Sequence, residues 1–179
     1  MTGITTTDGP KIPVLILSGS VGSGKTAVGY AAHELLSDRR VPHAFLDLDG
    51  LSCSWPPVGP FNEGLVLEGV GRLWPMYRAA GAERLLLARV IENKADLQAY
   101  AGAIADARVT LCRLTASEAV RRARLKARHG GRALKWHLAR TVELEAVLER
   151  AALEDFHVDN ERRSPEETAL EVLMRAQWL

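Results

Sequence analysis

The run GSVGSGKT, from Gly19 to Thr26, decides the fold. Its glycines leave the backbone open, so that successive N–H groups can point at one anion without side chains in the way. The apolar run IPVLILS (12–18) precedes it and is typical of a buried strand, and a helical stretch over about 24–36 follows. A glycine-rich loop between a strand and a helix predicts a site for phosphate groups.

We expect different roles for the residues of this phosphate-binding loop (P-loop). Lys25 supplies a positive charge for the β- and γ-phosphates of ATP, and the hydroxyl of Thr26 can bind Mg²⁺. The N-terminus of the following helix adds its partial positive charge. We therefore predict ATP and Mg²⁺ as cofactors, and a nucleotide-binding loop made of Gly19, Ser20, Val21, Gly22, Ser23, Gly24, Lys25 and Thr26.

Short apolar runs alternate with longer helical stretches along the rest of the chain. Further strands are expected at 43–48, 83–91, 107–114 and 155–159. Helices are expected at 64–80 (interrupted by Gly69, Gly71 and Pro75), 94–104, 116–129 and 135–152. A last helix follows Ser164, with Pro165 in its first position and Glu167 completing a capping box. This alternation predicts an α/β fold with a doubly wound, five-stranded parallel sheet.

Composition limits the classes of protein to consider. Hydrophobic residues make up 47% of the 179 residues, and 23 Lys and Arg stand against 22 Asp and Glu. This near-neutral balance gives no general reason to expect nucleic acid or an anionic membrane as a partner. Cys53 and Cys112 form no disulfide framework or metal-ligand pattern, so reduced thiols are expected. Without a signal peptide or membrane-spanning run, we expect a cytoplasmic protein with a flexible N-terminus (1–11) and one domain (12–179).

Four segments together carry a resemblance to known enzymes. They are the P-loop, FLDLDGL (45–51), RLTAS (113–117) with the Arg-rich stretch after it, and the ending DFHVDN (155–160) with SPEETALEVL (164–173). This set resembles the P-loop kinases of the adenylylsulfate kinase, gluconate kinase and chloramphenicol phosphotransferase group, and most of all the adenylylsulfate-kinase-like proteins of actinobacteria. The resemblance implies a monomeric or homodimeric kinase that transfers the γ-phosphoryl group of ATP to a hydroxyl of a small molecule.

Two carboxylates lie at the end of the second expected strand, at the edge of the sheet where ligands bind. Asp47 and Asp49 are expected to lie beside the P-loop, where one can accept the proton of an acceptor hydroxyl and the other can orient Mg²⁺ through water. The resemblance favours Asp49 as the base and leaves Asp47 for the metal, whereas the residues alone would equally fit solvated carboxylates at a turn. The next loop, with Trp55 and Phe61, forms either an acceptor pocket or a loop packed on itself. Trp74 and Trp136 are expected in the core.

Arginines recur along the stretch after the fourth expected strand. Arg121, Arg124 and Arg128 share one helical face, Arg132 follows Gly130-Gly131, and Arg140 lies in the next helix. By resemblance this helix–loop–helix is a lid whose arginines neutralise the transferring phosphoryl group, although a solvated basic face fits the spacing too. The nucleotide base is expected near 160–163. The predicted catalytic residues are Lys25, Asp49, Arg128 and Arg132, and the further nucleotide contacts are Arg140 and Asn160.

Two features leave alternatives open. The third strand has no Asp directly after its apolar run, with Glu92 as the nearest substitute, so a nucleotide-binding module without phosphotransfer stays possible on sequence grounds. The stretch after Asp49 also lacks the Arg that adenylylsulfate kinases carry there, which disfavours adenylylsulfate as the acceptor.

A small GTPase is the other alternative, because DLDG (47–50) and NKAD (93–96) fit two of its patterns. Only 22 positions separate Lys25 from Asp47, too few for the helix, switch loop and strand that a GTPase needs there. We therefore interpret NKAD as the start of a surface helix.

Overall fold

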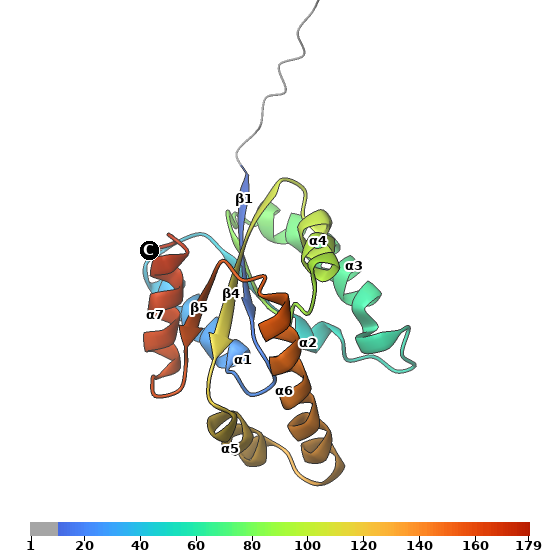
Figure 1. Cartoon of the computed structure of the whole chain (residues 1–179). Coiled ribbons are helices and arrows are strands. Elements are labelled where there is room, and N and C mark those ends of the chain that lie inside the picture. The colour runs from blue at the N-terminus through green and yellow to red at the C-terminus, as the bar shows by residue number, and fades with distance from the viewer. Residues whose placement is uncertain (1–10) are drawn as a thin grey trace, which may run out of the picture.

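The computed structural model describes residues 11–179, in which helices and strands alternate as expected (Figure 1). In chain order the elements are β1 (Ile12–Ser18), α1 (Lys25–Asp38), β2 (Ala44–Asp47), α2 (Leu48–Leu51), η1 (Pro60–Asn62), α3 (Glu63–Ala79), β3 (Leu85–Ala88), α4 (Lys94–Ala103), β4 (Ala107–Thr115), α5 (Glu118–Arg128), α6 (Gly131–Ala151), β5 (Phe156–Asp159) and α7 (Pro165–Arg175). The prediction of a flexible N-terminus falls, apart from Lys11, outside the described residues.

The five strands form one parallel sheet in the order β2-β3-β1-β4-β5. β3 thus lies between β2 and β1. The reason is burial: β3 reads LLLA and is buried on both faces, which suits a central place, whereas β2 alternates buried and half-buried residues as an edge strand does.

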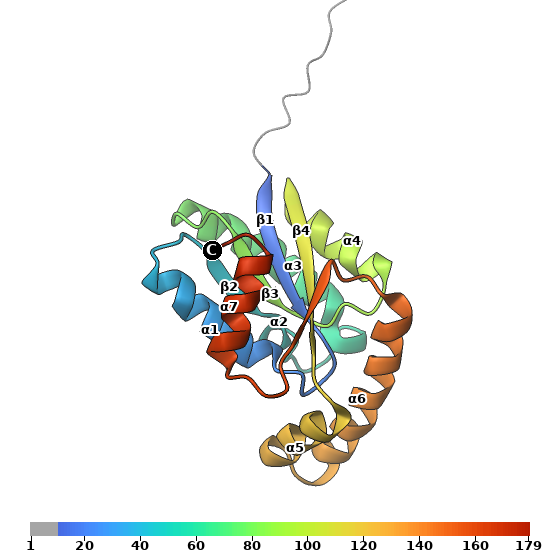
Figure 2. The ribbon, with the colours of Figure 1, turned by 60° about the vertical axis from the view of Figure 1, so that its left-hand side comes forward.

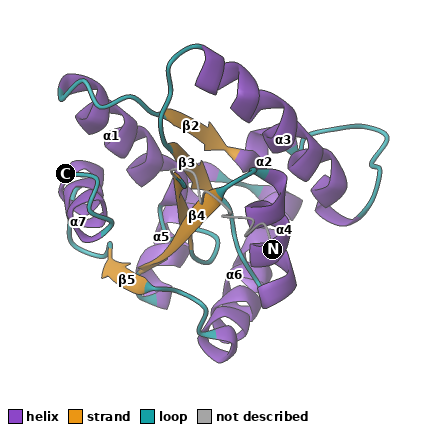
Figure 3. Cartoon of the chain, turned by 90° about the horizontal axis from the view of Figure 1, so that it is seen from above, coloured by secondary structure: helices purple, strands orange, loops and turns teal. Residues whose placement is uncertain are grey.

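Helices cover both faces of the sheet (Figure 3). Successive side chains of β1 point to opposite faces, because a strand has a period of two. Val14 and Ile16 join the core formed with α3 and α4, and Leu15 and Leu17 join the core formed with α1 and α7. The predicted doubly wound, five-stranded parallel sheet is confirmed.

Helix α3 runs unbroken through Gly69, Gly71 and Pro75, where the sequence predicts interruptions. Val66, Val70 and Trp74 recur at every fourth position and are buried, so the apolar stripe fixes the helix on the sheet despite its weak formers. A Cβ atom on Gly71 would lie 3.4 Å from the carbonyl oxygen of Ala103, at the end of α4. The glycine therefore permits close packing of α3 and α4.

Helices α5 and α6 project beyond the carboxyl ends of the strands (Figure 2). Ser117 caps α5, and the predicted capping box of Ser164 and Glu167 opens α7. Within residues 11–179, no helix is both long and apolar enough to cross a lipid bilayer.

Candidate active site

A cavity of about 640 Å³ lies at the carboxyl edge of the sheet, within the range of roughly 300–1,000 Å³ usual for small-ligand sites. The P-loop, α2, η1, the segment after β3, and helices α5 and α6 all contribute to its wall. Its lining residues are Val21, Gly22, Gly24, Lys25, Thr26, Asp49, Ser52, Pro60, Phe61, Glu63, Arg89, Val90, Glu92, Asn93, Asp96, Leu125, Arg128, His129, Trp136, His137, Arg140 and Leu144.

The P-loop glycines are required by the packing of the loop as well as by phosphate. Gly19 and Gly24 have φ of 139° and 105°, in the left-handed region that L-residues avoid. A Cβ atom on Gly19 would lie 2.5 Å from the carbonyl oxygen of Leu114, and one on Gly24 would overlap the side-chain amide of Asn160. The loop thus fits closely against β4 and the segment after β5.

Lys25 begins α1 and is buried within the loop that precedes it. Its Nζ donates hydrogen bonds to the carbonyl oxygens of Gly19 (2.9 Å) and Ser20 (3.3 Å). Burial lowers the pKa of Lys25, and the nearby carboxylates of Asp49 and Asp47 act in the opposite direction. Lys25 and Thr26 both line the cavity. This arrangement fits a bound polyphosphate with its Mg²⁺.

Side chains from distant segments hold the P-loop in place through hydrogen bonds. Thr141 of α6 donates to the carbonyl oxygen of Val21 (2.7 Å), and Ser20 donates to Glu145 on the same helix (2.7 Å). Arg124 of α5 donates to the carbonyl oxygens of Gly22 and Ser23, at 3.3 and 3.2 Å. The two helices predicted as a lid therefore also fix the loop.

Asn160 and Arg121, two residues that the sequence placed near the nucleotide, are structural braces here. Asn160 is buried, donates to the carbonyl oxygen of Ser23 (2.8 Å), accepts from the hydroxyl of Thr168 (2.9 Å) and does not line the cavity. Arg121 is buried and pairs with Glu145 (3.1 Å), which excludes a solvated face at this position. The predicted nucleotide contact of Asn160 stays a prediction, because its side chain bonds to Ser23 and Thr168 and is not in the cavity lining.

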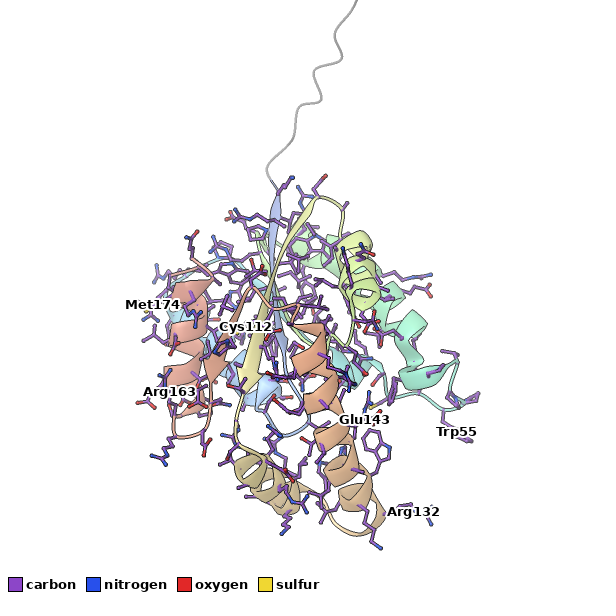
Figure 4. All side chains as sticks on the ribbon, viewed as in Figure 1. Trp55, Cys112, Arg132, Glu143, Arg163 and Met174 are labelled. Atoms are coloured by element: carbon purple, nitrogen blue, oxygen red, sulfur yellow. The ribbon has the colours of Figure 1, made fainter. Side chains whose placement is uncertain are left out.

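The predicted lid arginines divide into two sets. Arg128 and Arg140 line the cavity, and Arg140 forms ion pairs with Glu92 and with Glu143 (3.0 Å). Arg132 is exposed at the outer end of α6, where Figure 4 shows it pointing away from the rest of the molecule. The structure thus brings Arg128 and Arg140 to the site but not Arg132, whose catalytic role stays a prediction.

Asp47 and Asp49 have different surroundings. Asp47 caps α2 by accepting the backbone N–H of Asp49 (3.1 Å) and is not among the lining residues of the cavity. Asp49 lines the cavity, and its Oδ1 accepts a hydrogen bond from Arg89 (3.1 Å). Among the described residues, no hydrogen bond to Oδ2 of Asp49 is formed. That oxygen is therefore available as an acceptor.

Arg89 directly follows β3, at the position where the sequence lacks the expected Asp. It is buried and bridges two carboxylates, Asp49 and Glu63, while the hydroxyl of Tyr100 donates to Glu63 (2.6 Å). Burial raises the pKa of Tyr100 well above its ordinary value, so this hydroxyl stays protonated and donates. Sequence reasoning missed Arg89 and Glu63, although a charged residue within the apolar run RLLLARVI was a signal.

Two aromatic side chains from different elements line the cavity and form a tilted pair. The rings of Phe61, in η1, and Trp136, in α6, lie 6.5 Å apart, and the guanidinium of Arg140 lies 5.4 Å from the Phe61 ring. Trp136 is 49% exposed, so its expected place in the core is wrong, whereas Trp74 is buried as predicted. Trp55 is 90% exposed and extends into solvent (Figure 4), so the pocket uses only the end of this loop.

Two histidines complete the wall near α6. The rings of His129 and His137 lie 4.1 Å apart, and desolvation lowers the pKa of His137, with a smaller contribution from His129. Asn93 caps α4 by accepting the N–H of Asp96 (3.0 Å), so the interpretation of NKAD as a helix start is confirmed. Cys53 and Cys112 are both free, as expected.

No protein-family model and no curated protein matches the chain by sequence. The fold is similar to that of a gluconokinase from Sinorhizobium meliloti, with a TM-score of 0.63, 19% identity, and 93% of this chain and 92% of that one covered. It is also similar to a shikimate kinase from Acinetobacter baumannii solved with shikimate, with a TM-score of 0.62, 17% identity and 93% and 94% coverage.

An APS kinase from Mycobacterium tuberculosis shares the fold as well, with a TM-score of 0.58, 14% identity, and 95% of this chain and 99% of that one covered. These likenesses show that the chain has the fold of P-loop small-molecule kinases, as predicted.

Proposed function

We propose that the protein is a kinase that transfers the γ-phosphoryl group of ATP to a hydroxyl of a small molecule. One observation carries the proposal: Lys25 of the P-loop and Asp49, one of whose carboxylate oxygens accepts no hydrogen bond from the described residues, line the same cavity. A phosphate site opposite a proton acceptor is the minimum that phosphoryl transfer to a hydroxyl requires. The fold shared with small-molecule kinases supports it.

In the proposed reaction, Asp49 accepts the proton of the acceptor hydroxyl as the hydroxyl oxygen bonds to the γ-phosphorus. The bond from that phosphorus to the bridging oxygen breaks, and ADP leaves. Arg89 fixes the other oxygen of Asp49, so the base is oriented before the acceptor binds. Lys25, and Arg128 with Arg140, would neutralise the charge on the phosphoryl oxygens.

Thr26 would hold Mg²⁺ directly, and Asp47 would orient it through water, because a hydroxyl and a carboxylate are oxygen ligands of the kind that Mg²⁺ prefers. The ion would neutralise phosphate charge when bound. The outward position of Arg132 means that its proposed role needs α6 to bend or move toward the P-loop.

The test is incubation with γ-labelled ATP, Mg²⁺ and a library of small hydroxyl compounds, followed by separation of labelled products. We expect transfer of label from ATP to at least one compound, and no transfer by the Asp49→Asn variant. Label released only as inorganic phosphate, by wild type and variant alike, would contradict a kinase.

A second candidate, a nucleotide-binding module without phosphotransfer, is favoured by one observation. The end of β3 carries Arg89 in place of a carboxylate, and the nearest acid, Glu92, is paired with Arg140. Tight binding of Mg·ATP with no transfer to any hydroxyl compound would support this candidate.

A further inference from the structure

The cations on the acceptor side of the cavity already have anionic partners. Arg89 is buried and donates to Asp49 and Glu63. Arg140 pairs with Glu92 and Glu143. An acidic group on the acceptor would compete with these carboxylates for the same cations and would lie beside their negative charges.

The net charge of the side chains on the acceptor side of the cavity also disfavours an anionic acceptor. The cavity is lined by four carboxylates (Asp49, Glu63, Glu92, Asp96) and four cations (Lys25, Arg89, Arg128, Arg140). In the proposed function Lys25, Arg128 and Arg140 serve the phosphates, which leaves four carboxylates against one cation, Arg89. The remaining wall therefore repels anions and attracts cations.

The apolar part of the same wall suits a flat ring. Phe61 and Trp136 form one tilted aromatic pair at the cavity wall with ring centroids 6.5 Å apart, and both are about half exposed, at 56% and 49%. Exposed aromatic rings beside carboxylates bind ring-bearing molecules and organic cations, because the ring faces carry negative charge.

We propose that the acceptor is an uncharged or cationic hydroxyl compound with a flat ring face, and that compounds with a carboxylate, sulfate or phosphate group are excluded. The ring packs against the exposed surfaces of Phe61 and Trp136, and the hydroxyl reaches Oδ2 of Asp49. This inference rests on the proposed function for the position of the acceptor, and it adds the charge and shape of that molecule.

Three para-substituted benzyl alcohols test the inference, because they share a ring with a hydroxymethyl group and differ in a para substituent that is cationic, neutral or anionic. They are 4-(aminomethyl)benzyl alcohol, 1,4-benzenedimethanol and 4-(hydroxymethyl)benzoate. Ligand-observed NMR titration in the presence of Mg·ADP gives the dissociation constant of each. We expect the cation and the neutral diol to bind at least about tenfold more tightly than the benzoate, in line with the cost of placing like charges together.

Two variants sharpen the test. Glu63→Gln removes one negative charge from the wall while its amide oxygen can still accept from Tyr100, so the benzoate should bind more tightly and the cation more weakly. Glu68→Gln, the same change at an exposed position of α3 outside the cavity, is the matched control and should change neither. Phe61→Ser should weaken all three compounds alike.

Benzoate that binds as tightly as the other two, or a cation and diol that both fail to bind, would overturn the inference. Stabilisation by Mg·ATP is measured separately on the same samples. Its loss would count against the proposed nucleotide site and not against the charge of the acceptor.

Discussion

The two ends of the cavity are fixed by different kinds of interaction. At the phosphate end, side chains donate hydrogen bonds to backbone carbonyl oxygens: Thr141 to Val21, Asn160 to Ser23 and Lys25 to Gly19. At the acceptor end, charged side chains bond to one another, with Arg89 between Asp49 and Glu63 at its centre.

Because of this difference, we expect substitutions at the two ends of the cavity to act in different ways. A bond to a backbone carbonyl does not depend on the charge of that residue's side chain, so substitutions at the phosphate end act mainly through the fit and position of the loop. An ion pair changes with each partner, so one substitution at the acceptor end alters its charge. We therefore expect variants at the two ends to affect different steps, nucleotide binding at one end and acceptor use at the other.

The largest effect is expected for Lys25→Ala, which should abolish binding of Mg·ATP. A ligand at a hundred times its dissociation constant stabilises the native state by about 2.7 kcal/mol, so thermal denaturation with and without Mg·ATP measures the loss. The fold should remain, because burial disfavours the charged form of Lys25. Lys126→Ala removes an exposed lysine of α5 and is the control; equal stabilisation of Lys25→Ala and wild type would show that the loop assignment is wrong.

Asp49→Asn should leave the affinity for ATP unchanged and lower the rate of phosphotransfer by roughly 10²–10⁴-fold, the usual contribution of a general base. Steady-state rates with the acceptor found in the library screen measure the change, and calorimetry measures ATP binding. Asp47→Asn is the comparison, because that residue caps α2 outside the cavity wall. If Asp47→Asn loses the rate and Asp49→Asn keeps it, the roles of the two residues are exchanged.

Asn160→Ala should destabilise the fold by about 1–3 kcal/mol, since it leaves the buried carbonyl oxygen of Ser23 and the hydroxyl of Thr168 with one partner fewer. Urea denaturation measures this free energy, and ATP affinity should fall only slightly. The opposite pattern, unchanged stability with ATP binding lost, would restore Asn160 as the direct nucleotide contact that the sequence predicts.

The smallest effect is expected for Asp96→Ala. Asp96 lies in the first turn of α4 and accepts the N–H of Glu92 (3.1 Å), a local contact that nucleotide binding does not need. Calorimetric titration should give the same affinity for ATP as in wild type, and ATP should bind at least as tightly as GTP. A preference for GTP that disappears in the variant would favour a GTPase, whose Asp at this position reads guanine through two hydrogen bonds.

The phosphate end could be predicted from the sequence because its chemistry lies in one run of eight residues, Gly19 to Thr26, between a strand and a helix. Alternation of apolar and helical stretches likewise predicted five parallel strands. The strand order was not predicted, because the position of β3 between β2 and β1 depends on packing over both faces of the sheet.

The acceptor end could be predicted only in part. Asp49 and Phe61 lie in a loop that the sequence singled out, but Arg89, Glu63 and Trp136 reach the same cavity from β3, α3 and α6. Their meeting depends on the crossing of these elements, which no local pattern encodes. The same limit explains Arg132: helical spacing groups it with the lid arginines, yet it follows the turn between α5 and α6 and faces outward.

The proposed function requires Lys25 and Asp49 to lie on either side of one transferred phosphoryl group. A crystal structure with Mg²⁺ and a non-hydrolysable ATP analogue tests it most directly. We predict the γ-phosphate between Lys25 and Asp49, with room for a hydroxyl between that phosphate and Oδ2 of Asp49, on the side of Phe61 and Trp136. A γ-phosphate directed away from Asp49, or a nucleotide base seated between Phe61 and Trp136, would contradict it.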